Sequence, residues 1–198
     1  MKTRVLNLPN SISLLRLAAV PLVAWLILQQ HWFAACLLFL AAAVSDAIDG
    51  LLARWLEQTT PLGAALDSVA DKALALVTLV LLTQAGAIPV WVAVAILLRD
   101  SVVVLGALGY RGVAGHLEIH PTWLGKSHMF TAFAMLALVL GARADLVALG
   151  AWQAPMFAAV FGIAVASGVQ YAWIWGGRAR RERRDVVYKA AGSEGLEQ

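Results

Sequence analysis

Long apolar segments alternate with short polar connections along the whole chain. A transmembrane helix needs roughly 20 predominantly apolar residues to cross the hydrocarbon core of a bilayer. Six segments meet this length, and they run over residues 12–29, 32–55, 66–84, 88–110, 124–142 and 152–175. Only the connections at 56–65 and 111–123 are longer and more polar than a tight turn. The pattern therefore predicts an all-α polytopic membrane protein with six transmembrane helices.

The composition agrees with this class of protein. Of the 198 residues, 61% are hydrophobic and 14% are charged, whereas a soluble domain is roughly half apolar and about a quarter charged. The single cysteine, Cys36, excludes an intrachain disulfide framework. The formal net charge is +3, but the basic residues cluster at the ends of apolar segments, most densely in GRARRERR at 177–184. This distribution is typical of the flanks of membrane helices and argues against a nucleic-acid partner.

The Lys and Arg residues predict the orientation of the chain in the membrane. They lie in the N-terminal tail, in or beside the two longer connections and in the C-terminal tail, whereas the opposite side carries only Arg143. Cytoplasmic segments are enriched in these residues, so we expect both termini in the cytoplasm, which requires an even number of spans. We expect residues 1–178 to form the membrane domain and residues 179–198 to form a basic, mobile cytoplasmic tail.

The N-terminal segment also invites a second interpretation. Lys2 and Arg4 precede an apolar run, as in a secretory signal peptide. Arg16 interrupts that run, however, and no clear cleavage site follows it closely. We therefore interpret the segment as the first transmembrane helix. Because the short N-terminus lacks the features of a transit peptide, we expect a multi-pass protein of a prokaryotic inner membrane.

Four aspartates lie close together between the second and third apolar segments. A charged side chain in a membrane segment is costly unless it faces protein, water or an ion, so such residues are functional candidates. Asp46 and Asp49 are three residues apart, and Asp67 and Asp71 are four apart. Each pair therefore lies on one face of its predicted helix, and we expect the two helices to face each other. Loop charges or helix caps would account for one or two of these residues, but not for four.

Carboxylates in this number indicate a site for divalent cations. They repel one another unless cations neutralise them, and oxygen ligands select Mg²⁺, Mn²⁺ or Ca²⁺. Four carboxylates suit two ions, an arrangement used for displacement at phosphorus. Gly50, Ala53 and Gly63 leave room beside the aspartates for a bulky group, and Arg54 can hold a phosphate through two hydrogen bonds. The residues favour phosphoryl-type transfer at the cytoplasmic end of these helices.

The spacing of these residues resembles the signature of the CDP-alcohol phosphotransferase family. Residues 46–71 read D-x2-D-G-x2-A-R-x8-G-x3-D-x3-D without a departure. The opening stretch PNSISLLR at 9–16 is similar to the family's P-N-x-x-T-x-x-R, with Ser13 in place of Thr. The resemblance implies a six-helix membrane enzyme, commonly a homodimer, that moves a phosphatidyl group from CDP-diacylglycerol to an alcohol and releases CMP.

The resemblance also implies roles for individual residues. The four aspartates would ligate two Mg²⁺ or Mn²⁺ ions, and Asp71 would also be the general base that takes the proton of the acceptor hydroxyl. The residues implied for the cytidine diphosphate site are Gly50, Ala53, Arg54 and Gly63, with Asn10 and Arg16 near the nucleotide or its phosphates. The alternative for Asn10 is a cap of the first helix.

Two further stretches bear on the acceptor alcohol. LLRDSVVVLGALGYR at 97–111 and HPTWLGKSHMFTAF at 120–133 resemble the cardiolipin-synthase-like branch of the family. The phosphatidylglycerophosphate-synthase-like branch more often has R-E in place of R-D, but its glycine-lysine pair is matched at 125–126, and SGVQY at 167–171 is similar to both branches. Phosphatidylglycerol would give cardiolipin, and glycerol 3-phosphate would give phosphatidylglycerophosphate.

Three cations in these stretches are candidate ligands of the acceptor phosphate, because buried cations near a cavity need an anion. They are Arg99, Arg111 and Lys126. Each has a structural alternative: an ion pair with Asp100 for Arg99, snorkelling to the interface for Arg111, and a topology charge for Lys126. The nearby His116, His120 and His128 are interpreted as interfacial polar residues, with a contact to the acceptor as the alternative.

Three other functions compete with this interpretation. A divalent-cation transporter would spread acidic residues over several helices near the bilayer midplane, often with internal repeats. A membrane prenyltransferase would hold its aspartate motifs on well-separated helices. A catalytically silent scaffold would lack part of the motif. Within the family, inositol phosphate and serine are alternative acceptors.

Overall fold

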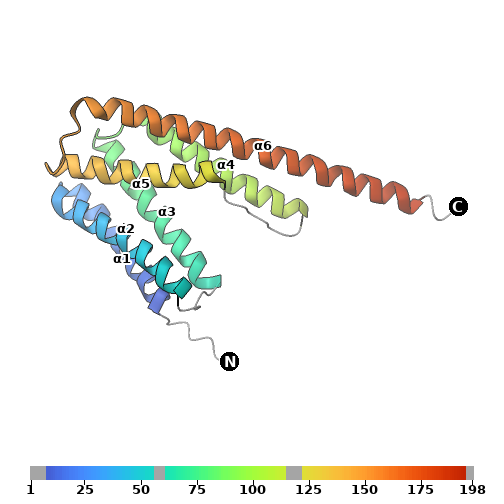
Figure 1. Ribbon diagram of the computed structural model, residues 1–198, viewed down its shortest axis with the longest axis horizontal. Coiled ribbons are helices and arrows are strands. Elements are labelled where there is room, and N and C mark those ends of the chain that lie inside the picture. Colours follow the sequence, from blue (N-terminus) through green and yellow to red (C-terminus); the bar gives the residue numbers. More distant parts are fainter. Residues whose placement is uncertain (1–7, 56–60, 115–121, 195–198) are drawn as a thin grey trace. The chain divides into compact units, whose positions relative to one another are not determined.

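The computed structural model describes the backbone of residues 8–55, 61–114 and 122–194, and the side chains of residues 15–45, 69–109 and 122–177. All of its described elements are helical (Figure 1). They are α1 (Leu8–Leu28), α2 (Trp32–Trp55), α3 (Pro61–Gln84), α4 (Val90–Ala114), α5 (Trp123–Arg143), the short 3-10 helix η1 (Gly150–Trp152) and α6 (Gln153–Glu194). The six helices predicted from the apolar segments are therefore confirmed.

Three of the helices end in the same turn, in which the second residue after the helix adopts a left-handed backbone conformation. These residues are Gln30 (φ 58°), Gly86 (φ 67°) and Asp145 (φ 57°). The next amide in each turn donates to a carbonyl five residues earlier, as from His31 to Leu26, from Ala87 to Leu82 and from Leu146 to Gly141. The turn satisfies terminal carbonyls and explains why the connections after α1, α3 and α5 can be short.

The helices divide into two compact units. The first comprises residues 1–93 and 132–156, and the second comprises residues 94–131 and 157–198. In the first unit α1 packs against both α3 and α2, while α2 and α3 contact each other much less. The aromatic rings of Phe39 and Phe133 stack with their centroids 5.8 Å apart. Other fully buried side chains of this unit are Val23, Leu74, Leu82, Ile88, Leu136 and Leu140.

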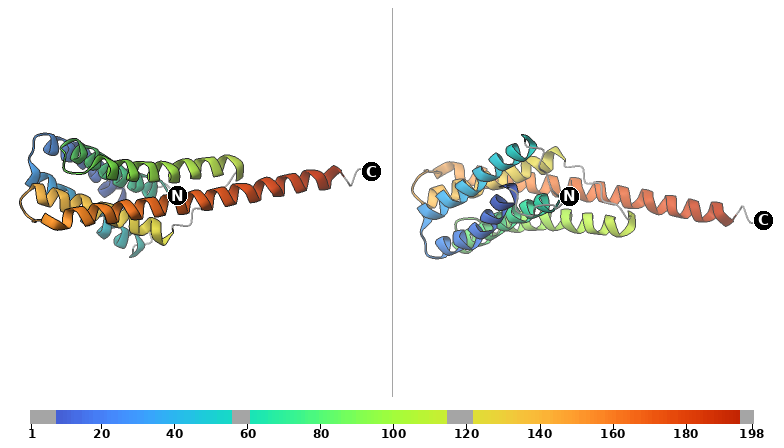
Figure 2. Two further views of the ribbon diagram at one scale, coloured as in Figure 1. Left: turned by 90° about the horizontal axis from the view of Figure 1, so that it is seen from above. Right: turned by 90° about the horizontal axis from the view of Figure 1, so that it is seen from below.

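The second unit contains most of α4, the first turns of α5 and most of α6. Gly106 of α4 makes a close approach possible, because a Cβ atom there would lie 2.5 Å from Cδ1 of Trp175 on α6. Trp175 is buried as a result. Figure 2 shows α6 as one continuous helix that runs past the end of α4. The helix includes most of the basic tail expected at 179–198; the mobility of that tail stays a prediction.

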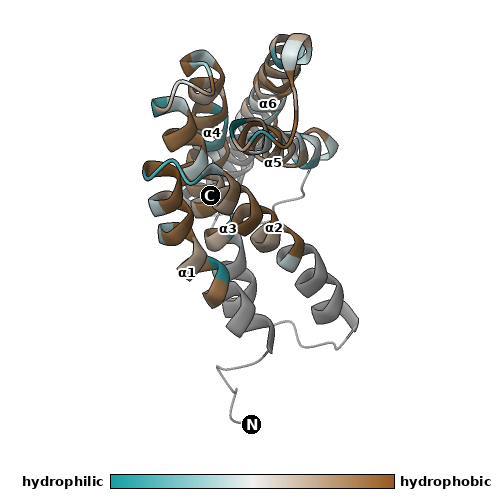
Figure 3. Ribbon diagram, turned by 90° about the vertical axis from the view of Figure 1, so that its left-hand side faces the viewer, coloured by the Kyte–Doolittle hydropathy of each residue, from teal (hydrophilic) through white to brown (hydrophobic). Residues whose placement is uncertain are grey.

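The surfaces of the helices are apolar. Figure 3 shows apolar residues over most of the described helical positions, and large side chains such as Trp25, Leu105 and Trp173 are exposed. Contiguous apolar surface of this kind marks interaction sites such as a membrane face. Three described helices are long and apolar enough to cross a bilayer: Val90–Gly109, Trp123–Arg143 and Gly150–Gly177. The described parts of α1 and α2 hold shorter apolar stretches, Leu15–Leu28 and Trp32–Ser45.

Candidate active site

The four aspartates lie on two consecutive helices of the first unit. Asp46 and Asp49 are in the C-terminal half of α2, and Asp67 and Asp71 are in the N-terminal half of α3. Because both stretches are helical, each pair shares one face. Only Asp71 belongs to the residues whose side chains are described. The side chains of Asp46, Asp49 and Asp67, and the surroundings of Asn10, Gly50, Ala53, Arg54 and Gly63, lie outside that set.

Asp71 is joined to the first helix by a buried ion pair. Nη1 of Arg16 on α1 donates to Oδ1 of Asp71 on α3 at 2.8 Å. The two side chains are 1% and 9% exposed. Charged groups are buried at little cost only when they are paired and hydrogen-bonded. The packing of α1 against α3 thus brings together two residues that the sequence pattern connects with the nucleotide site and with the general base.

The Asp71 carboxylate suits a hard divalent cation. It is a hard oxygen ligand and it is buried. The helical register of α3 places the Asp67 position one turn earlier on the same face. Carboxylate oxygens are the ligands that Mg²⁺ and Mn²⁺ prefer. Asp71, the one aspartate of the four whose side chain is described, therefore has the ligand chemistry that the predicted metal requires.

A second polar cluster lies in the second unit around Arg99 of α4. Its Nη1 donates to Oδ1 of Asp100 at 2.7 Å, and its Nε donates to Oγ of Ser167 on α6 at 3.2 Å. The guanidinium carbon also lies 5.4 Å from the ring centroid of Tyr171. Three contacts therefore hold this cation in one orientation, and its side chain stays 12% exposed.

His128 adds to this cluster from α5. Its Nε2 lies 3.8 Å from Oδ1 of Asp100, and the residue is buried. His128 is therefore not an exposed interfacial residue, because it lies inside the protein beside Asp100, and the alternative of an acceptor contact stays a prediction. Sequence reasoning also missed Ser167 and Tyr171 as partners of Arg99. The only available signal was their presence in the SGVQY stretch.

The other two candidate acceptor cations differ from Arg99. Lys126, near the start of α5, is exposed, and its ammonium lies 5.7 Å from the ring centroid of Trp123. Arg111 lies in α4, but its side chain is outside the described set. The structural alternative for Arg99 was an ion pair with Asp100, and this ion pair is present. The ion pair leaves the Arg99 side chain partly exposed. Arg99 is thus a fixed cation and Lys126 an exposed one.

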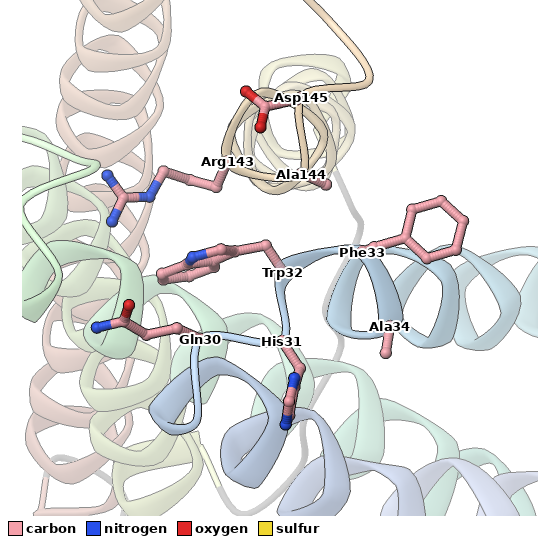
Figure 4. Close-up of a pocket in the computed structure, with 8 residues that line it drawn as sticks. All are labelled: Gln30, His31, Trp32, Phe33, Ala34, Arg143, Ala144 and Asp145. Atoms are coloured by element: carbon pink, nitrogen blue, oxygen red, sulfur yellow. The ribbon is translucent and has the colours of Figure 1, made fainter.

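A hollow of about 470 Å³ lies at the opposite end of α2, between the α1–α2 turn and the end of α5 (Figure 4). The guanidinium carbon of Arg143 lies 4.6 Å from the ring centroid of Trp32, while the carboxylate of Asp145 points away from that ring. Asp46 is 14 residues further along the helix than Trp32, which is about 21 Å at 1.5 Å per residue. The hollow is therefore separate from the aspartates.

Comparison with known proteins identifies the family. A sequence model described as CDP-alcohol phosphatidyltransferase matches residues 6–170. This range includes the four aspartates, the ion pair of Arg16 with Asp71, and the polar cluster around Arg99 except for Tyr171. The chain belongs to this family. It is a CDP-alcohol phosphatidyltransferase by class, and the resemblance drawn from the spacing of the aspartates is confirmed.

Relatives of this CDP-alcohol phosphatidyltransferase carry two kinds of name. This chain is 36% identical to cardiolipin synthase (CMP-forming) of Streptomyces coelicolor over 183 residues, which are 88% of this chain and 80% of that protein. It is 39% identical to CDP-diacylglycerol–glycerol-3-phosphate 3-phosphatidyltransferase of Pseudomonas fluorescens over 145 residues, 68% and 71% of the two chains. Human cardiolipin synthase (CMP-forming) is 38% identical over 105 residues, 52% of this chain and 35% of that protein.

Proposed function

We propose that this protein transfers the phosphatidyl group of CDP-diacylglycerol to a glycerol-based acceptor and releases CMP. The observation that carries the proposal is the complete eight-residue signature at 46–71 within a family match over residues 6–170. Phosphatidylglycerol is the first candidate acceptor, because the R-D stretch at 99–100 resembles the cardiolipin-synthase-like branch. Glycerol 3-phosphate is the second, because of the relative from Pseudomonas fluorescens. The family favours an enzyme over the divalent-cation transporter.

The reaction requires one bond to form and one to break at the phosphatidyl phosphorus. The acceptor hydroxyl oxygen attacks that phosphorus, its proton passes to the Asp71 carboxylate, and the bond to the bridging oxygen breaks so that CMP departs with that oxygen. Asp46, Asp49, Asp67 and Asp71 would hold two Mg²⁺ or Mn²⁺ ions. Bound divalent ions would supply neutralisation of the diphosphate charge.

Arg16 has a specific part in this scheme. Its ion pair with Asp71 holds the carboxylate of the base in one position on α3. A base has to lie within hydrogen-bond reach of the proton that it removes, so a fixed carboxylate is an advantage. Gly50, Ala53, Arg54 and Gly63 would line the cytidine diphosphate site, with Asn10 and Arg16 near the nucleotide or its phosphates.

Arg99 would bind the phosphate of the acceptor, with Arg111 and Lys126 as further cations. The contacts of Arg99 with Ser167 and Tyr171 support this role, because a pre-oriented guanidinium loses less entropy on binding a phosphate. Both candidate acceptors carry a phosphate and a glycerol hydroxyl, which explains how one cation set would serve either.

The membrane arrangement belongs to the same proposal. Six spans would place both termini and the aspartate ends of α2 and α3 at the cytoplasmic face of an inner membrane, with the protein as a homodimer. The long apolar helices support this arrangement, as does the excess of Lys and Arg in the tails. The CDP-diacylglycerol chains would stay in the lipid while its head group reaches the aspartates.

The acceptor is tested by offering phosphatidylglycerol and glycerol 3-phosphate in parallel to the purified protein with CDP-diacylglycerol and Mg²⁺. The lipid products are identified by mass spectrometry. Cardiolipin as the product would support the first candidate, and phosphatidylglycerophosphate would support the second. Inositol phosphate and serine as additional acceptors test the broader family alternatives, and a product from either of these alone would overturn the glycerol-based proposal.

A further inference from the structure

Tyr171 lies where three helices of the second unit meet. It is on α6 and is buried. The face of its ring lies against the guanidinium of Arg99 on α4, with the carbon 5.4 Å from the ring centroid. Its hydroxyl oxygen accepts a hydrogen bond from the backbone amide of Thr122, just before α5, at 3.4 Å. One side chain thus contacts both the fixed cation and the start of the helix that carries Lys126.

The first turn of α5 is shaped around the Tyr171 hydroxyl. A Cβ atom at Gly125 would lie 2.7 Å from that hydroxyl oxygen and 3.2 Å from Cε2 of the same ring. Real Cβ atoms do not approach another heavy atom as closely as the first distance, so the ring occupies space that only glycine leaves. The Gly125 amide also donates to Oγ1 of Thr122 at 3.1 Å. Thr122 therefore contacts the Tyr171 hydroxyl through its amide, and Gly125 leaves room for the ring. Lys126 is the next residue of α5.

We propose that Tyr171 is a positioning residue for the acceptor site. Its ring orients Arg99, and its hydroxyl fixes the turn that presents Lys126, so that the two cations keep a constant geometry for the acceptor phosphate. The inference rests on the proposed function, in which these cations bind that phosphate. Tyr171 touches neither the acceptor nor the donor, but it determines how well the acceptor is held.

The test separates acceptor binding from donor binding. In Tyr171→Phe the ring stays against Arg99 and only the hydroxyl contact with α5 is lost, so the acceptor KM should rise by about three- to tenfold. Tyr171→Leu also loses the contact with Arg99 and should raise the acceptor KM further. The KM for CDP-diacylglycerol should stay within about twofold of wild type in both variants, because Tyr171 contacts Arg99, Thr122 and Gly125, none of which is proposed for the donor site. Trp173→Phe, an exposed aromatic residue on the same helix, is the matched control and should change neither KM.

Gly125→Ala provides a second, independent variant. Its Cβ would displace the tyrosine, so the acceptor KM should rise in the wild-type background. In the Tyr171→Phe background the hydroxyl is absent and the closest contact is removed, so the same alanine should raise the acceptor KM by a smaller factor. A merely structural role would lower the unfolding temperature without this selective and non-additive change in the acceptor KM.

The outcomes distinguish this inference from the function on which it rests. If the wild type transfers the phosphatidyl group but Tyr171→Phe and Gly125→Ala keep the wild-type acceptor KM, or raise the donor KM equally, then Tyr171 is not a positioning residue and the proposed function stands. If the wild type releases no CMP with phosphatidylglycerol, glycerol 3-phosphate or another acceptor, the proposed function fails and this inference fails with it.

Discussion

Replacing Arg16 with glutamine tests the link between the buried ion pair and the metal site. The substitution removes a guanidinium that lies 2.8 Å from Asp71 and leaves a carboxylate that is only 9% exposed. Removing one partner of a buried ion pair costs about 3–5 kcal/mol. In a chain of this size 1 kcal/mol shifts the unfolding temperature by about 2–4 °C. We therefore expect Arg16→Gln to unfold roughly 6–20 °C below the wild type in the absence of divalent ions.

Added Mg²⁺ should reverse part of this loss. If Asp71 is a metal ligand, a bound divalent ion supplies the positive charge that the missing guanidinium provided. Mg²⁺ should therefore raise the unfolding temperature of Arg16→Gln by more than it raises that of the wild type. The assay is thermal unfolding of the detergent-purified protein in EDTA and across a Mg²⁺ titration. Leu15→Ala, at an exposed neighbouring position on α1, is the control for a general loss of helix stability.

Two results would refute this reasoning. If Arg16→Gln unfolds at the wild-type temperature in EDTA, the ion pair contributes nothing to stability. If Mg²⁺ stabilises the variant and the wild type equally, Asp71 and the metal are not coupled. The double variant Arg16→Gln/Asp71→Asn sharpens the test, because removing the second charge should restore part of the stability lost in the single variant.

Three further predictions concern the aspartates and the second unit. Asp71→Asn should abolish turnover while leaving CDP-diacylglycerol binding largely intact. Release of labelled CMP from this variant at the wild-type rate would rule out Asp71 as the general base. Asp46→Asn should shift the Mg²⁺ dependence of activity to higher concentrations, and an unchanged dependence would count against its role as a ligand. Gly106→Ala should lower the unfolding temperature, because its Cβ would lie 2.5 Å from Trp175, whereas Gly109→Ala meets no atom within 4 Å and should not.

The helices of this protein follow closely from its sequence. The apolar segments predicted at 32–55 and 124–142 correspond to α2 (Trp32–Trp55) and α5 (Trp123–Arg143). Agreement is close because both segments are apolar over most of their length and are bounded by polar connections, which the hydropathy pattern reports directly. The third segment was predicted from residue 66, whereas α3 begins at Pro61. Its first turn contains proline and glycine, which interrupt the apolar pattern, although proline is favourable at the start of a helix.

The contacts between helices were not predictable in the same way. Arg16 and Asp71 are 55 residues apart, and nothing in the local spacing of either residue selects the other as a partner. The same is true of Arg99 and Ser167, which are 68 residues apart. The aspartate pairs could be recognised because their members lie within one helical turn of each other, where sequence spacing and spatial proximity coincide. Contacts between helices depend on how the helices pack.

The central claim is that the aspartates of α2 and α3 catalyse phosphatidyl transfer from CDP-diacylglycerol. The most direct measurement compares purified wild-type protein with Asp67→Asn in the presence of Mg²⁺, CDP-diacylglycerol and either glycerol-based acceptor, and quantifies CMP and new phospholipid together. We expect one molecule of phospholipid for each CMP from the wild type and neither product from the variant. No CMP from the wild type with either acceptor, or equal CMP from the variant, would contradict it.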